Sequence, residues 1–67
     1  MSLPPETNLD KQESDLVVIK LKSGEYQVAY FDYDDMIWWS VTNNNSENED
    51  DIASWAPIGI WEEASYD

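Results

Sequence analysis

The sequence has no cysteine, no histidine and no arginine among its 67 residues, and only two glycines. Without cysteine there are no disulfides and no thiolate zinc sites, and no oxidising compartment is implied. Without histidine, the usual acid–base group of enzymes at neutral pH is missing. Any catalysis would rest on carboxylates, hydroxyls, amides or lysines. We therefore expect a protein that is not an enzyme and that needs no cofactor and no metal ion.

Positive charge and long apolar runs are scarce as well. Fifteen Asp and Glu residues stand against three lysines, which gives a formal net charge of −12. Because phosphates must be met by cations, we predict neither direct nucleic-acid binding nor membrane binding. No apolar run approaches the roughly 20 residues of a membrane span, and the start of the chain is acidic rather than basic. We expect a cytoplasmic protein whose partner is a protein with a basic surface, and we leave self-association open.

Short segments rich in β-branched and aromatic residues follow one another along the chain, separated by polar turns. They predict strands over 15–22, 25–33 and 36–42, and a short fourth strand over 52–58. Pro57 would confine the fourth strand to an edge or a strand end, because proline cannot donate to a strand ladder. We expect an all-β fold, a small antiparallel meander of three to four strands. The alternative is an SH3-like, partly open barrel.

The segments outside these strands are polar. Residues 1–14 contain two adjacent prolines and no periodicity, so we predict a flexible N-terminal arm. Residues 43–51 (NNNSENEDD) predict a polar loop. For the rest of the chain we predict a single β domain over 15–61 and an acidic C-terminal tail over 62–67.

The two predicted hairpins agree on one apolar face. A two-residue turn at 23–24 separates polar from apolar cross-strand pairs. A second turn at 34–35 places Tyr30 opposite Trp39, on the same side as the first apolar set. We predict that this face is the core; its residues are Val17, Ile19, Leu21, Tyr26, Val28, Tyr30, Trp39 and Val41.

The opposite face carries a second apolar patch, which one sheet cannot cover. Its members are Leu16, Val18, Ala29, Phe31 and Trp38, with Tyr33 and Met36 near the turn. Two hypotheses account for it. Either the C-terminal residues Trp55, Ile58, Ile60 and Trp61 fold over the patch, or Phe31 and Trp38 form an exposed surface that binds a partner.

The acidic residues form the other candidate binding surface. They cluster at the second turn and in the loop, at Asp32, Asp34, Asp35, Glu47, Glu49, Asp50 and Asp51. One interpretation is a mimic of DNA that occupies a basic groove, since about 28 Å of duplex carries roughly 16 charges. The other is a solvated surface that keeps a small protein soluble. The loop lacks the spacing of an EF-hand, so it does not predict a calcium site.

The aromatic residues allow two interpretations. Small barrels of the SH3 and Tudor type use such side chains as a cage or platform for peptides and methylated cations. The candidates here are Tyr30, Phe31, Trp38, Trp39 and Trp55. The alternative is core packing, because a small sheet needs large side chains.

The stretch 17–57 resembles a small family of phage and prophage proteins, the domain of unknown function 551. The matching features are an aliphatic strand at 17–19, an Ala-Tyr-Phe strand at 29–31, and an acidic turn before Trp38-Trp39. A Trp-x-Pro motif follows at 55–57, and it lacks the His and Met that members of the family often carry there. The resemblance implies a compact β domain of phage or mobile-element origin and assigns no activity. Our hypothesis is a small, acidic, non-enzymatic protein–protein interaction module, with DNA mimicry against a host nucleic-acid-binding protein as the alternative.

Overall fold

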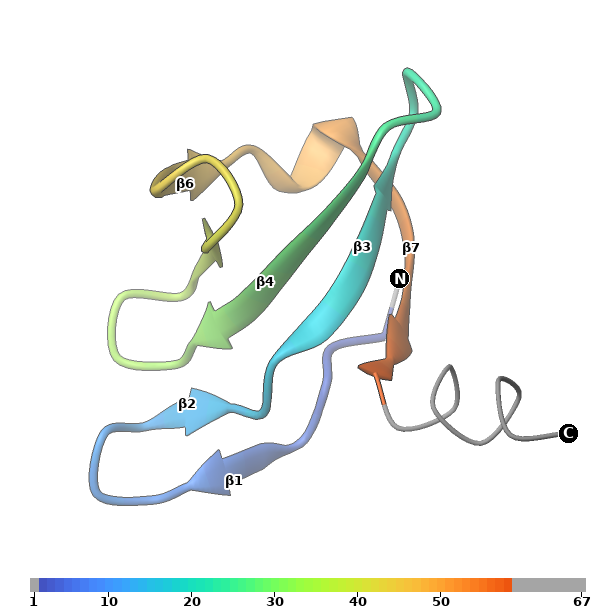
Figure 1. The fold of residues 1–67 in the computed structure, drawn as a ribbon. Helices are drawn as coiled ribbons and strands as arrows, with labels where there is room; N and C mark the ends of the chain where they lie inside the picture. Colours follow the sequence, from blue (N-terminus) through green and yellow to red (C-terminus); the bar gives the residue numbers. More distant parts are fainter. Residues whose placement is uncertain (1, 59–67) are drawn as a thin grey trace, which may run out of the picture.

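The computed structural model describes residues 2–58, which form one curled antiparallel sheet that closes into a half-barrel (Figure 1). Its strands are β1 (Glu6–Asn8), β2 (Glu13–Ser14), β3 (Val17–Leu21), β4 (Tyr26–Asp32), β5 (Ile37–Ser40), β6 (Asn45–Glu47) and β7 (Ile52–Pro57), with a 3-10 turn, η1 (Glu49–Asp51), before β7. The prediction of a small all-β fold is confirmed. The predicted acidic tail, and the cover assigned to Ile60 and Trp61, lie outside the described residues.

Strand β4 is the centre of the sheet. It pairs with β3 along one edge and with β5 along the other, and β5 pairs in turn with β6. Strand β7 pairs with the far edge of β3, so the last strand returns to the first of the central hairpin rather than to β5. Within the described residues β7 has no second partner strand, which suits Pro57 at its end. The predicted fourth strand is therefore present, at the sheet edge.

Residues 1–14 do not form the flexible arm that their polarity predicted. Strands β1 and β2 make a hairpin, and β2 continues beside β4 on the edge that β3 also uses, with Glu13 opposite Asp32. The buried Ser14 hydroxyl joins the two ladders. Its Oγ accepts from the backbone N–H of Phe31 at 2.9 Å and donates to the carbonyl of Asp15 at 2.9 Å.

The start of the chain is fastened to the core as well. Pro4 is fully buried, and its carbonyl accepts a hydrogen bond from the Tyr33 hydroxyl. The indole N–H of Trp55 donates to the carbonyl of Ser2 at 2.8 Å. The prediction failed because composition counts the many polar residues of this arm, whereas its order depends on a few anchors whose partners lie far along the chain.

The segment 43–51 is also more structured than the predicted polar loop. It contains β6, which pairs with β5, and η1. Asn44 has a φ of 55°, a left-handed conformation that Asn tolerates better than most residues. The side chain of Asn48 caps η1 by accepting from the N–H of Asp50 at 2.9 Å. Two asparagines of this segment therefore have structural roles, one in a turn and one as the cap of η1.

The turn between β3 and β4 is one residue longer than predicted. The N–H of Gly24 donates to the carbonyl of Leu21 at 2.8 Å, and the N–H of Leu21 donates to the carbonyl of Glu25 at 2.8 Å. Gly24 has a φ of 98°, which closes a three-residue loop with a bulge at the glycine. As a result Ile19 lies opposite Gln27, instead of opposite Val28.

This change of one residue reverses the faces of β4 and β5, because side chains alternate along a strand. The pairing of Tyr30 with Trp39 is confirmed, so both strands turn over together. Within the described residues the core consists of Val17, Ile19, Ala29, Phe31, Trp38 and Ile52, with Leu3, Leu21, Tyr33 and Trp55 packed against it. The predicted core was right for β3 but wrong for Tyr26, Val28, Tyr30, Trp39 and Val41, which lie on the outside of the curl.

Candidate functional site

Two of the predicted partner-binding residues, Phe31 and Trp38, are core residues. Their side chains are 3% and 1% exposed, and their rings meet edge to face with centroids 5.3 Å apart. Tyr33 also packs against Phe31, with ring centroids 4.8 Å apart in an edge-to-face arrangement. The prediction of an exposed patch here is wrong, because the reversal of β4 turns both side chains inward. Of the predicted covering residues, Trp55 does pack against this cluster.

The predicted acidic residues lie on the surface, and several are neighbours. The N–H of Tyr33 donates to the carbonyl of Gln12 at 2.7 Å, which joins the β1–β2 turn to the β4–β5 turn. Met36 and Ile37, at the β4–β5 turn, line one hollow together with Glu47 and Glu49. In Figure 1 these three segments lie on the same side of the molecule. We call this the acidic edge: Glu13, Asp32, Asp34, Asp35, Glu47 and Glu49.

The other two predicted acidic residues, Asp50 and Asp51, follow Glu49 in η1, and Asp51 lines a second hollow together with Glu47. The carbonyl of Asp51 accepts from the N–H of Lys22 at 2.8 Å, which ties η1 to the β3–β4 turn. Lys20 and Lys22 both lie at this end of the sheet, and the Nζ of Lys20 stands 5.8 Å from the ring centroid of Tyr26. Lys20 and Lys22 thus share their end of β4 with Asp50 and Asp51, whereas the acidic edge lies toward the other end of β4.

The reversal of β4 and β5 brings five residues to the side where Leu16 and Val18 already lie. We call this side the outer face: Leu16, Val18, Tyr26, Val28, Tyr30, Trp39 and Val41. Three of them are large and strongly exposed, namely Tyr26 (57%), Leu16 (48%) and Val41 (48%). Val18 and Val28 are cross-strand partners and are half-buried. A face of this composition on a small acidic chain is unusual unless something binds to it.

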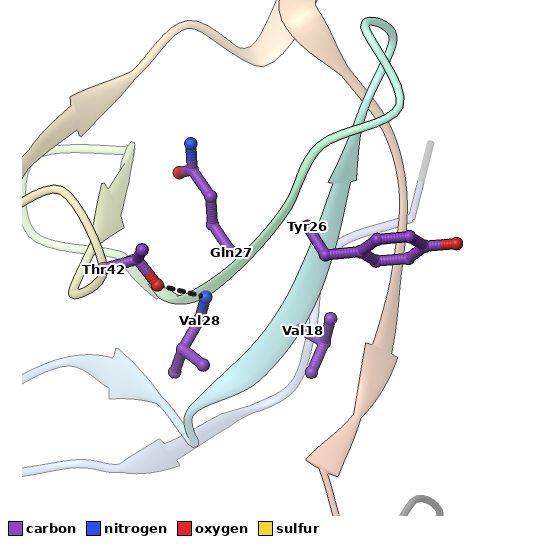
Figure 2. Close-up of a pocket in the computed structure, with 5 residues that line it drawn as sticks. All are labelled: Val18, Tyr26, Gln27, Val28 and Thr42. Carbon is purple, nitrogen blue, oxygen red and sulfur yellow. Dashed lines mark hydrogen bonds between the residues drawn. The ribbon is translucent and has the colours of Figure 1, made fainter.

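A shallow hollow marks the middle of the outer face. Figure 2 shows Val18 and Val28 pointing to the same side of the sheet, with Tyr26 beside them, while Gln27 points to the opposite side. At its margin the Thr42 hydroxyl accepts from the N–H of Val28 at 2.9 Å, so the end of β5 is held close to β4. The floor is thus apolar, rigid and made by strand residues, which is the kind of surface that receives an apolar side chain of another protein.

One end of the outer face combines aromatic and acidic side chains. Tyr30 and Trp39 are cross-strand partners on β4 and β5. Asp32 follows Tyr30 by two residues, so it projects to the same side, and Glu13 lies opposite Asp32 across the β2–β4 ladder. Burial raises the pKa of Tyr30 above its ordinary value of 10.0, and the charges of Glu13 and Asp32 raise that pKa further. The outer face therefore ends in a strongly negative potential.

Two kinds of feature are absent from the part of the chain that the structure describes. Within residues 2–58, no three Asp or Glu side chains gather closely enough to hold a metal ion. The same residues include no helix that is long and apolar enough to cross a membrane. The surface features that remain are the apolar outer face and the acidic edge.

No protein-family model, curated protein or solved structure matches the chain. The resemblance to the domain of unknown function 551 stays a prediction, and the interpretation of the site rests on the geometry above.

Sequence reasoning found the acidic residues but assigned the outward residues of β4 and β5 to the core. The signal that could have found it is Gly24. A glycine as the third loop residue, after Lys22 and Ser23, is the signature of the three-residue hairpin with a bulge. Placing it there would have shifted the register by one and moved Tyr26, Val28 and Tyr30 outward.

Proposed function

We propose that the chain is a small, acidic, non-enzymatic protein–protein interaction module that binds its partner through the outer face. The observation that carries this proposal is the exposure of Tyr26 and Val41 beside an apolar hollow that no described segment covers. Burying such side chains against a partner yields roughly 25 cal/mol per Å2 before the costs of association. An origin in a phage or mobile element is part of the same proposal and rests on the resemblance alone.

The acidic edge sets the expected chemistry of the partner. Interfaces typically join an apolar centre to a polar rim, and complementary charge in that rim steers association. With Glu13 and Asp32 at the end of the outer face, the partner should present an apolar group flanked by basic residues. This accounts for both surfaces with one binding mode.

The test is affinity capture with the tagged protein from bacterial lysate, eluted with a salt gradient and identified by mass spectrometry. The variant Tyr26→Ser/Val41→Ser removes the exposed apolar groups. Leu9→Ser is the matched control, because Leu9 is 73% exposed but lies between β1 and β2, away from the hollow. A partner that survives high salt, binds Leu9→Ser and is lost from the double variant supports the proposal. Equal capture by all three proteins overturns it.

The acidic edge also favours a second candidate function, a DNA-mimic inhibitor of a host nucleic-acid-binding protein. Mimicry needs charges gathered on one side, and six acidic residues lie along this edge. In that case the captured partner is a nuclease, polymerase or repressor. It elutes early in the gradient, because exposed charges are screened within about 10 Å at 0.1 M salt. It also binds Tyr26→Ser/Val41→Ser as well as the unchanged protein.

A further inference from the structure

The aromatic and acidic end of the outer face has the composition of a site for a cationic side chain. Tyr30 and Trp39 are partners across the β4–β5 ladder, and both are half-buried, so part of each side chain is open to solvent. The next outward position of β4 is Asp32, about 6.6 Å farther along the strand. Glu13 completes the group from β2. Two rings and two carboxylates therefore come together from three strands.

The two carboxylates face each other across the β2–β4 ladder. The Asp32 Oδ1 accepts from the N–H groups of Asp34 and Asp35, which accounts for Asp32 at this turn but not for the facing Glu13. Like charges directly opposite on a sheet are destabilising. Lys20 and Lys22 lie at the other end of β4, and Lys11 belongs to the β1–β2 turn, where its backbone N–H donates to the Asn8 side chain. Burial raises the pKa of Tyr30, and the charges of Glu13 and Asp32 raise it further, in keeping with the closeness of these groups along the strands. A cation placed between the carboxylates and the rings would relieve this repulsion.

We propose that Tyr30, Trp39, Glu13 and Asp32 bind an arginine side chain that the partner protein presents. A guanidinium is planar and weakly hydrated, so it can stack on an aromatic ring while its N–H groups bind carboxylates. Cation–π contacts of this kind become stronger as the cation is desolvated. The chain already contains a contact of this type on the same face, where Lys20 lies over Tyr26. The site rests on the proposed function, because it names the group that anchors the partner beside the apolar hollow.

The test is an NMR titration of the whole 15N-labelled chain with a short probe peptide, Ac-Gly-Val-Arg-Val-Gly-NH2. The matched probe carries citrulline, which keeps the shape of arginine but lacks its charge. We expect saturable shifts of the Trp39 indole N–H and the Tyr30 amide with the arginine peptide. The citrulline peptide should bind at least about tenfold more weakly, as the loss of a cation–π and charge-assisted contact implies.

Two double variants separate a built site from general attraction to an acidic protein. Glu13→Gln/Asp32→Asn removes the two charges and keeps the Asp32 Oδ1 acceptor that binds the N–H groups of Asp34 and Asp35. Glu49→Gln/Asp50→Asn removes the same charge from the η1 region. We expect the first variant to weaken arginine binding about tenfold or more and the second to weaken it less than about twofold. Dispersed amide spectra of both variants show that they are folded.

The proposal is overturned if the citrulline peptide binds equally well, or if both double variants weaken binding by the same factor. It is also overturned if the shifts map away from Tyr30 and Trp39. These failures differ from failure of the proposed function. In the capture experiment, a partner lost from Tyr26→Ser/Val41→Ser but kept by Glu13→Gln/Asp32→Asn leaves the interaction module standing and removes only the arginine site.

Discussion

The two faces of the curled sheet contrast in an unexpected way. The inner face is fully buried, although it includes the polar residues Gln27 and Ser40. The outer face carries mostly apolar side chains where β3, β4 and β5 meet, with Lys20 beside Tyr26, and Tyr26 is more than half exposed. Simple patterning would place the more apolar face inside. The difference teaches that curvature and local hydrogen bonding, rather than polarity alone, decide which face of a small sheet becomes the core.

The polar residues of the inner face are tolerated because most of their groups find partners nearby. The Ser40 hydroxyl accepts from the N–H of Asn43 at 3.1 Å, and the Gln27 side-chain amide donates to Glu25. Large side chains, above all Trp38, then fill the concave side. The Nε1 of Trp38 and the Oε1 of Gln27 are buried without a partner, which costs stability. The inner face therefore forms the core although its two unpaired groups lower the stability. The outer face stays available for binding.

Substitution of the adjacent tryptophans, Trp38 and Trp39, is the strongest test of the contrast between the two faces. Trp38→Ala should cost about 3–5 kcal/mol, because it empties a fully buried site. That loss rivals the roughly 3–10 kcal/mol total expected of a 67-residue chain. Trp39→Ala, on the outer face, should cost roughly half as much or less. Urea unfolding followed by circular dichroism measures both, and Trp38→Phe serves if Trp38→Ala does not fold. Equal losses would contradict the assignment of the faces.

The next effect concerns Gly24, whose turn determines the faces of β4 and β5. Gly24→Ala should cost roughly 1–2 kcal/mol, since an L-residue is strained at a φ of 98°. No atom lies within 4 Å of the added Cβ, so backbone strain is the whole effect. Gly24→Asn should recover part of the loss, because Asn tolerates left-handed conformations. Urea midpoints of the two variants provide the measurement. A neutral Gly24→Ala would indicate a different turn.

A smaller effect tests how the N-terminal segment helps to enclose the inner face. Tyr33→Phe removes the hydrogen bond to the Pro4 carbonyl and should cost about 1 kcal/mol. Local opening of β1 and β2 should increase, so their amide hydrogens should exchange faster while those of β3 and β4 change less. Hydrogen exchange followed by NMR measures both. Unchanged protection of β1 and β2 would show that this hydrogen bond does not hold the arm.

The smallest effect concerns the outer face and appears only at high pH. The folded pKa of Tyr30 lies above its ordinary value of 10.0, so its neutral form is favoured in the folded state. The stability that this provides is complete below pH 10 and is lost as the pH rises through the folded pKa. Glu13→Gln should lower the pKa of Tyr30 without restoring the ordinary value, because burial is the larger cause. Absorbance titration at about 295 nm, with Tyr30→Phe as the reference, would detect this. An unchanged pKa would place Glu13 away from the ring.

The sequence by itself determined the all-β class, the approximate positions of the four main strands, and the pairing of Tyr30 with Trp39. These follow from strand-forming residues and turn residues that are local in the chain. It also determined the acidity of the surface, on which the structure places Asp32, Asp34, Asp35, Glu47 and Glu49; their role in binding a partner stays a prediction.

Only the tertiary structure decided which side of the sheet is the core. Both faces of β4 are apolar, so the side-chain pattern alone does not choose between them. One additional loop residue at Gly24 was enough to turn Phe31 and Trp38 inward in place of Tyr30 and Trp39. The order of the N-terminal segment was decided in the same way, through the contacts of Pro4 with Tyr33 and of Ser2 with Trp55. The physical reason is that alternation fixes which residues share a face, whereas burial depends on what the rest of the chain places against that face.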